Sequence, residues 1–129
     1  SSTGAYTGNY VSDEPCLKRR IPEALQGHLS DVCKNLQRHL QNVYSQGYSG
    51  PLGVDMMVVE YQGEKYIHPC VEVNLRQTMG NVCVSLRSQL RRGSAIYRLR
   101  PVEETTESTL VLTPYAKRIE AVLQTEEAE

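Results

Sequence analysis

The sequence predicts an α+β fold in which an antiparallel sheet is packed by a long helix and a second helix. Three observations predict it. Apolar residues repeat at helical spacing within residues 21–46, two runs rich in β-branched residues lie within residues 52–76, and a second helical pattern covers residues 78–92. With 129 residues the chain is long enough for one domain with its own core, so we predict a single domain over residues 1–129.

A glycine-rich opening segment covers residues 1–20, and Gly4 to Val11 reads as extended chain. The chain begins without methionine, and this segment has no earlier element to pair with. We therefore expect the sequence to be a piece of a longer protein. The glycines have two explanations: their backbone N–H groups bind an anionic substrate, or the chain needs their conformational freedom.

A long amphipathic helix is predicted over residues 21–46. Pro22 suits a first helical turn and Gly47 suits a stop. Between them the apolar residues follow in steps of three and four: Leu25, Leu29, Val32, Leu36, Leu40 and Val43. His28 and His39 lie at the margins of this stripe. We do not expect them to bind metal, because no carboxylate or cysteine shares their spacing.

An antiparallel hairpin is predicted over residues 52–76. The runs Leu52 to Tyr61 and Lys65 to Leu75 are rich in Val, Ile, Met and Tyr, and Gln62-Gly63 lies between them as a short turn. With that turn, the regular register places Asp55 opposite Cys70 and one diagonal step from Glu72.

A second helix is predicted over residues 78–92, capped by Thr78 and ending at Gly93. The amides at its start have two explanations, a site for an anion or a simple helix cap. Residues 94–125 are predicted to hold strands at Ala95 to Leu99 and Thr109 to Leu112, with an acidic turn between them at Glu103 to Glu107. A short helix is expected from Pro114 to about Gln124, before a frayed end at Glu126 to Glu129.

A polar patch is predicted on one face of the hairpin. Alternation along a strand sends Glu72, Asn74 and Arg76 to one side, and the register brings Asp55 to the same side. Two carboxylates and an amide oxygen suit Mg²⁺ or Mn²⁺, and an arginine beside them suits a phosphate. Such a set fits phosphoryl transfer, in which positioning and charge neutralisation supply most of the catalysis. The alternative is an ordinary Glu72–Arg76 ion pair beside a solvated Asp55.

Two segments together resemble the signature of the ATP-grasp superfamily: Gly53-Val54-Asp55-Met56-Met57-Val58, followed by Pro69-Cys70-Val71-Glu72-Val73-Asn74-Leu75-Arg76. The resemblance implies that Asp55, Glu72 and Asn74 bind the metal ions that bridge the phosphates of ATP. The E-x-N-x-R arrangement is similar to that of the carbamoyl-phosphate synthetase and glycinamide ribonucleotide synthetase branches, in which the arginine contacts phosphate. Glu72, Asn74 and Arg76 would thus bind the cofactor, and Arg76 would be catalytic.

The resemblance implies a function for a longer protein. That protein would be an ATP- and Mg²⁺-dependent ligase that joins a small carboxylate substrate to an amine or similar nucleophile through an acyl phosphate. This chain would be the carboxyl-terminal subdomain of the ATP-grasp domain. The amino-terminal subdomain, with its phosphate-binding lysines and glycine-rich lid, would be missing, so the chain alone should be inactive. Lys18, in a predicted loop, and Lys34, on a helix face, do not resemble those lysines.

The charge composition of the chain limits the classes of partner that we expect. The chain has 14 Lys and Arg against 15 Asp and Glu, so its net charge of −1 favours neither nucleic acid nor membrane as a partner. We expect a cytoplasmic protein, because no segment resembles a signal peptide or a membrane span. The four cysteines lack a C-x-x-C pair and are expected to be reduced, buried thiols: Cys16, Cys33, Cys70 and Cys83.

Three further possibilities follow from the sequence. The first is a non-catalytic module that binds a partner protein through the acidic patch. The second is RNA binding, which lacks the expected aromatic pattern on the sheet and would use a stripe of arginines: Arg87, Arg91, Arg92, Arg98 and Arg100. The third is a homodimer of the truncated chain, formed through the flat face that the missing subdomain would cover.

Overall fold

The computed structural model describes residues 2–90, 93–104 and 109–126, and the chain divides into two compact units. The sheet unit comprises Ser1–Leu17 and Val82–Glu129, and the hairpin unit comprises Lys18–Asn81. The α+β class is confirmed, but the antiparallel strands form two sheets, of four and two strands, instead of one. The sequence predicted a single domain. Its assignment as half of a larger domain stays a prediction.

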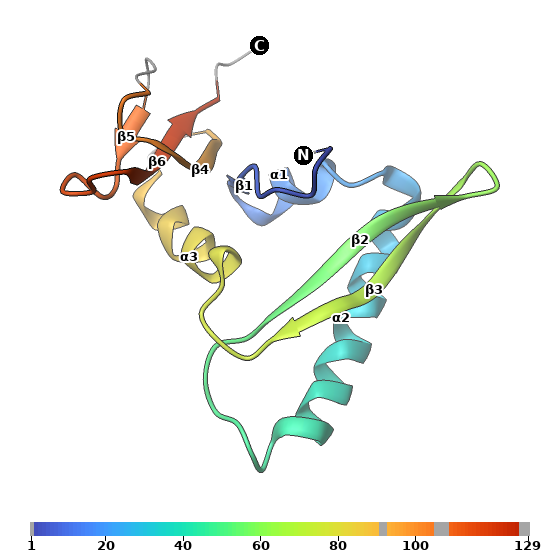
Figure 1. Ribbon diagram of the computed structural model, residues 1–129. Helices are drawn as coiled ribbons and strands as arrows, with labels where there is room; N and C mark the ends of the chain where they lie inside the picture. Colours follow the sequence, from blue (N-terminus) through green and yellow to red (C-terminus); the bar gives the residue numbers. More distant parts are fainter. Residues whose placement is uncertain (1, 91–92, 105–108, 127–129) are drawn as a thin grey trace. The chain divides into compact units, whose positions relative to one another are not determined.

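The sheet unit contains four antiparallel strands in the order β1-β4-β6-β5 (Figure 1). These are β1 (Asn9–Val11), β4 (Ala95–Pro101), β5 (Thr109–Val111) and β6 (Ile119–Thr125). Two of them, β4 and β5, confirm the strands predicted in this part of the sequence. β1 shows that the opening segment does have a partner, because its residues pair with those of β4.

The prediction of a helix from Pro114 to Gln124 is wrong, since Ile119–Thr125 forms β6. This strand lies between β4 and β5 and is buried at four consecutive residues from Glu120 to Leu123. A central strand covered on both faces shows no polar–apolar alternation. A short apolar run of this kind cannot be told from a helix by periodicity alone.

The sheet unit has a core of its own. Its buried cluster comprises residues from both ends of the chain, namely Val11, Cys83, Ala95, Tyr97, Ala121 and Leu123. Val82, Leu86, Leu90 and Leu112 pack against it. Beside this core, Arg100 of β4 opposes Glu120 of β6, and Nε of Arg100 lies 2.9 Å from Oε1 of Glu120 in a buried ion pair.

The hairpin unit is built from α2 (Glu23–Tyr44) and the antiparallel strands β2 (Gly53–Tyr61) and β3 (Glu64–Asn74). Figure 1 shows α2 alongside the hairpin. Both the long helix and the hairpin are therefore as predicted. The turn residues Gln62 and Gly63 have φ angles of 52° and 77°. Positive φ at both central residues is what a two-residue type I′ turn requires, and glycine adopts it without strain.

Two shorter helices differ from the predictions. α1 (Glu14–Arg19) was not predicted, and it places Lys18 on a helix instead of in a loop. α3 (Met79–Leu86) is shorter than the predicted helix and passes into a 3₁₀ turn over Arg87–Gln89.

Some predictions fall on parts of the chain that the structure does not describe. Arg91 and Arg92, most of the turn predicted at 103–107, and the frayed end at 127–129 lie outside the described residues. Within the described ranges, no helix is both long and apolar enough to cross a membrane.

Candidate functional site

The candidate site lies on the face of the hairpin that points away from α2. Val54 and Met56 line a pocket together with side chains of α2. Because neighbouring residues of a strand point to opposite faces, Asp55 between them points away from that helix. Asp55 is exposed, as a residue that binds a ligand from solvent must be.

The structure brings Asp55 directly opposite Glu72, not opposite Cys70 as predicted. The register changes between Asp55 and Met57: Met57 pairs with His68, so β3 carries two more residues than β2 over this stretch. Pro69 lies in the longer stretch, and proline cannot donate a ladder hydrogen bond, which is why it is found at bulges. Alternation is broken within the longer stretch, where Val71 is exposed and Cys70 is partly buried, but because the extra residues number two, His68 and Glu72 still pair with alternate residues of β2. Asp55 therefore pairs with Glu72 directly, and not with Cys70 one diagonal step away as predicted.

Asn74 and Arg76 join this face through hydrogen bonds. Nδ2 of Asn74 donates to Oδ2 of Asp55 at 3.4 Å, across the two strands. Nη2 of Arg76 donates to Oδ1 of Asn74 at 3.2 Å, and Nη1 of Arg76 donates to the carbonyl oxygen of Gln77 at 3.2 Å. The amide of Asn74 thus lies between a carboxylate and a guanidinium. Arg76 thus bonds the amide of Asn74, which differs from the Glu72–Arg76 ion pair considered as the alternative.

A filled helix cap fixes the chain beyond Arg76. Oγ1 of Thr78 donates to Oδ1 of Asn81 at 2.8 Å and accepts from the backbone N–H of Asn81 at 3.3 Å. The N–H of Thr78 also donates to Oδ1 of Asn81, at 2.9 Å. This reciprocal arrangement is that of a capping box. Of the two explanations for Thr78, the structure supports the helix cap.

Gly53 lets the helix cap lie close to the end of β3, because it pairs with Asn74 and contacts the side chain of Thr78. A Cβ atom at Gly53 would lie 2.8 Å from Cγ2 of Thr78. A side chain at this position would therefore push the cap away from the end of β3. Gly53 is a residue that positions the site and that the sequence marked only as part of a motif.

The donor set fits a hard divalent cation in type. Two opposed carboxylates and one amide oxygen are the ligands that Mg²⁺ and Mn²⁺ prefer, and the exposed face leaves room for water and phosphate oxygens. Among the described residues, no three His, Cys, Asp or Glu side chains gather as a metal site would require from those types alone. The amide oxygen of Asn74 is therefore essential to the interpretation.

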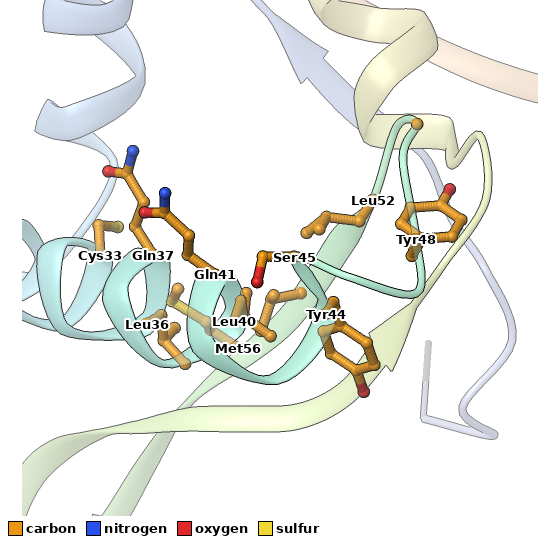
Figure 2. A pocket seen from close by; sticks show the side chains of 12 residues that line it. Cys33, Leu36, Gln37, Leu40, Gln41, Tyr44, Ser45, Tyr48, Leu52 and Met56 are labelled. Atoms are coloured by element: carbon orange, nitrogen blue, oxygen red, sulfur yellow. The ribbon is translucent and has the colours of Figure 1, made fainter.

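The opposite face of the hairpin carries a pocket that the sequence did not predict. It has a volume of about 520 Å³ and lies between α2 and β2. Its lining, drawn in Figure 2, includes Leu36, Leu40 and Tyr44 of the helix together with Leu52 and Met56. The predicted stripe marks Leu36 and Leu40 as inward-facing, but it includes Val43, which is 71% exposed, in place of Tyr44.

Residues 2–17 of the opening segment belong to the sheet unit and not to the hairpin unit, which carries Asp55. Gly8 has a φ angle of 145°, and a Cβ atom there would lie 2.6 Å from the carbonyl oxygen of Tyr97. Close approach to β4 therefore explains this glycine. Gly4 has a φ angle of 77° and open space around it.

The cysteines are free thiols, as predicted, but most are not buried. Cys83 is buried, Cys16 and Cys70 are partly exposed, and Cys33 is exposed. Burial raises the pKa of the Cys83 thiol. Cys83 lies in the core of the sheet unit, so its role there is packing.

The comparisons with known proteins add no relative to this description. No family model, no curated protein and no solved structure matches the chain.

Proposed function

We propose that the hairpin unit is part of an ATP-grasp ligase and supplies its magnesium and phosphate ligands. In this proposal the chain is the carboxyl-terminal subdomain of the ATP-grasp domain. The observation that carries the proposal is the pairing of Asp55 with Glu72 across the hairpin, with the amide of Asn74 bonded to Asp55 on the same face. The same residues form the motif that resembles the family.

The electrostatics of this pairing support a cation. Like charges placed directly opposite one another on two strands destabilise a sheet. Asp55 and Glu72 are such a pair, and both are exposed. A divalent cation bound between them would turn this repulsion into attraction. Asp55, Glu72 and Asn74 would hold Mg²⁺ or Mn²⁺, which when bound neutralises the charge of the phosphates.

The reaction that fits these ligands is the activation of a small carboxylate by ATP. A carboxylate oxygen of the substrate attacks the γ-phosphorus, and the bond to the β–γ bridging oxygen breaks to release ADP. An amine then attacks the acyl carbon, loses a proton, and phosphate leaves. Arg76, a permanent cation with a planar set of donors, would bind the phosphoryl oxygens during transfer.

The remaining parts of the enzyme would come from elsewhere. The proposal requires an amino-terminal ATP-grasp subdomain to hold the nucleotide, and it places the protein in the cytoplasm, where ATP and Mg²⁺ are present. It assigns no nucleic acid or membrane as a partner. The buried ion pair of Arg100 with Glu120 removes one arginine from the stripe considered for RNA. A homodimer of the chain alone is a further expectation of the proposal.

The test is ATP turnover by a protein in which this chain is joined to the missing subdomain. Asp55→Asn and Glu72→Gln should each lower kcat by roughly a hundredfold or more, the size expected when a group that stabilises transition-state charge is lost. Glu60→Gln is the matched control, because Glu60 is also an exposed acidic residue of the hairpin. Turnover that survives both site changes would contradict the proposal.

A second candidate function is a non-catalytic module that binds a partner protein. The observation that favours it is the exposure of large apolar side chains along the hairpin: Met57 is 52%, Tyr61 65% and Tyr66 46% exposed. Exposed groups of this kind mark interaction surfaces. If ATP turnover were insensitive to Asp55→Asn and Glu72→Gln, and partner binding were lost in Tyr61→Ser, this function would be favoured.

A further inference from the structure

The two ends of the Asn74 side-chain amide have different partners. Its oxygen accepts from Nη2 of Arg76 at 3.2 Å, and its nitrogen donates to Oδ2 of Asp55 at 3.4 Å. A side-chain amide has one oxygen and one nitrogen, so each end has a different partner. The end that faces the carboxylates is the nitrogen, which cannot bind a metal.

Binding of a cation requires the opposite orientation. For Oδ1 of Asn74 to bind a metal held by Asp55, the amide must rotate so that its oxygen faces Asp55. The same rotation would turn Nδ2 toward the guanidinium, and two donors facing each other form no hydrogen bond. The positive charges of the metal and of Arg76 would also repel one another. A metal bound by Oδ1 of Asn74 would therefore compete with the hydrogen bond between Arg76 and Asn74.

We infer that Arg76 and a divalent cation compete for Oδ1 of Asn74, so that metal binding releases Arg76 from Asn74. This inference rests on the proposed function. While bonded to Asn74, Arg76 satisfies the amide oxygen and also donates to the carbonyl oxygen of Gln77. Once a metal takes that oxygen, the guanidinium is free to turn to a phosphate. The site would thus make its phosphate-binding arginine available in response to the metal.

Arg76→Gln should strengthen metal binding and weaken phosphate binding. Arg76→Gln removes the competing cation, so the 129-residue chain should bind Mn²⁺ alone more tightly, by roughly twofold to fivefold, the effect of one exposed charge contact. In the presence of Mn²⁺, the same variant should bind inorganic triphosphate more weakly than the wild type does. Arg38→Gln is the control, because Arg38 is an exposed arginine of α2 that bonds Asn35.

The experiment is a titration with Mn²⁺ followed by the electron paramagnetic resonance signal of the free ion. It is paired with NMR of the Asn74 side-chain amide during addition of Mg²⁺. We expect tighter Mn²⁺ binding in Arg76→Gln, and a shift of the Asn74 amide signal in the wild type. Mn²⁺ affinity that is unchanged or weaker in Arg76→Gln, while Asp55→Asn still weakens it, would overturn this inference alone. Failure of every variant to bind Mn²⁺ would overturn the proposed function and this inference with it.

Discussion

The sheet unit and the hairpin unit differ in how completely each buries its own apolar side chains. In the sheet unit, Val11 and Val122 are 1% exposed. In the hairpin unit, all of whose residues the structure describes, Leu25 is the only buried residue. A two-stranded hairpin is marginal by itself, and three or more strands or a packed helix are needed for independent stability. The candidate site is therefore carried by the part of the chain with the smaller core.

This difference indicates separate roles for the two units. The sheet unit buries a charged pair in its interior, Arg100 with Glu120. The hairpin unit places its polar groups on an open face, where Asp55 and Glu72 meet solvent. Segments that bind ligands commonly belong to the less stable parts of a protein. Changes in the sheet unit should therefore alter stability, and changes in the hairpin should alter binding.

The largest effect is expected from breaking the buried ion pair. Glu120→Ala removes the carboxylate that pairs with the buried Arg100 and should destabilise the sheet unit by about 3–5 kcal/mol, the usual cost of breaking a buried ion pair. Urea unfolding followed by NMR should show a lower midpoint for resonances of the sheet unit. The exposed control Glu60→Ala should change stability by less than about 0.5 kcal/mol. Replacement of both charges, Arg100→Met with Glu120→Leu, should recover most of the loss, and an unchanged midpoint in Glu120→Ala would contradict the assignment.

A pair of glycine substitutions compares two positions within the hairpin unit. Gly53→Ala forces Thr78 to move, because the added Cβ would lie 2.8 Å from its Cγ2. We expect a loss of about 1–3 kcal/mol, the usual cost of overpacking. Gly27 lies within α2 and has no atom within 4 Å of an added Cβ. Gly27→Ala should instead stabilise the unit by about 0.5–1 kcal/mol. Thermal unfolding measures both changes in stability. If both variants were stabilised, the packing described at Gly53 would be contradicted.

Alkaline pH should weaken the sheet unit. Desolvation, with smaller contributions from Cys83 and Tyr97, raises the pKa of Tyr6 from 10.0 to about 12. A group whose pKa is higher in the folded state stabilises the fold below its unfolded pKa, and that contribution is lost as pH rises through the folded value. Stability should therefore fall between pH 10 and about 12. Tyr6→Phe should reduce this fall in denaturant titrations, and an equal fall in the variant would contradict the assignment to Tyr6.

The smallest perturbation is chemical labelling of the thiols, which tests burial in each unit without substitution. Cys33 of the hairpin unit is exposed, whereas Cys83 of the sheet unit is buried with a raised pKa. Because the thiolate is the reactive form, Cys83 should react with iodoacetamide more slowly than Cys33 at pH 8. Mass spectrometry of peptides after timed quenching measures both rates. Equal rates under native conditions would mean that the sheet unit opens readily.

Local patterns predicted the hairpin unit well. The apolar stripe of α2 and the Gln62-Gly63 turn are signals carried by neighbouring residues, and both elements form where they were expected. Alternation also placed Asp55, Glu72 and Asn74 on one face. The exact register was missed because the extra residues near Pro69 are accommodated by a bulge, which depends on the partner strand.

The sheet unit was predicted less well because its structure depends on distant contacts. The sequence of β6 alone is compatible with a helix, and its strand conformation depends on pairing with β4 on one side and β5 on the other. β1 pairs with β4, which is more than 80 residues away in sequence, as the Tyr10–Ile96 pairing shows. No local pattern contains such a pairing. The pairing of β1 with β4 was therefore absent from the sequence-based prediction.

The most direct test of the metal site is paramagnetic broadening of the amide resonances of the 129-residue chain by substoichiometric Mn²⁺. The account predicts broadening centred on Asp55 in β2 and on Glu72 to Asn74 in β3, lost in Asp55→Asn and kept in Glu60→Gln. Broadening confined to other acidic segments, or unchanged in an Asp55→Asn, Glu72→Gln double variant, would contradict it.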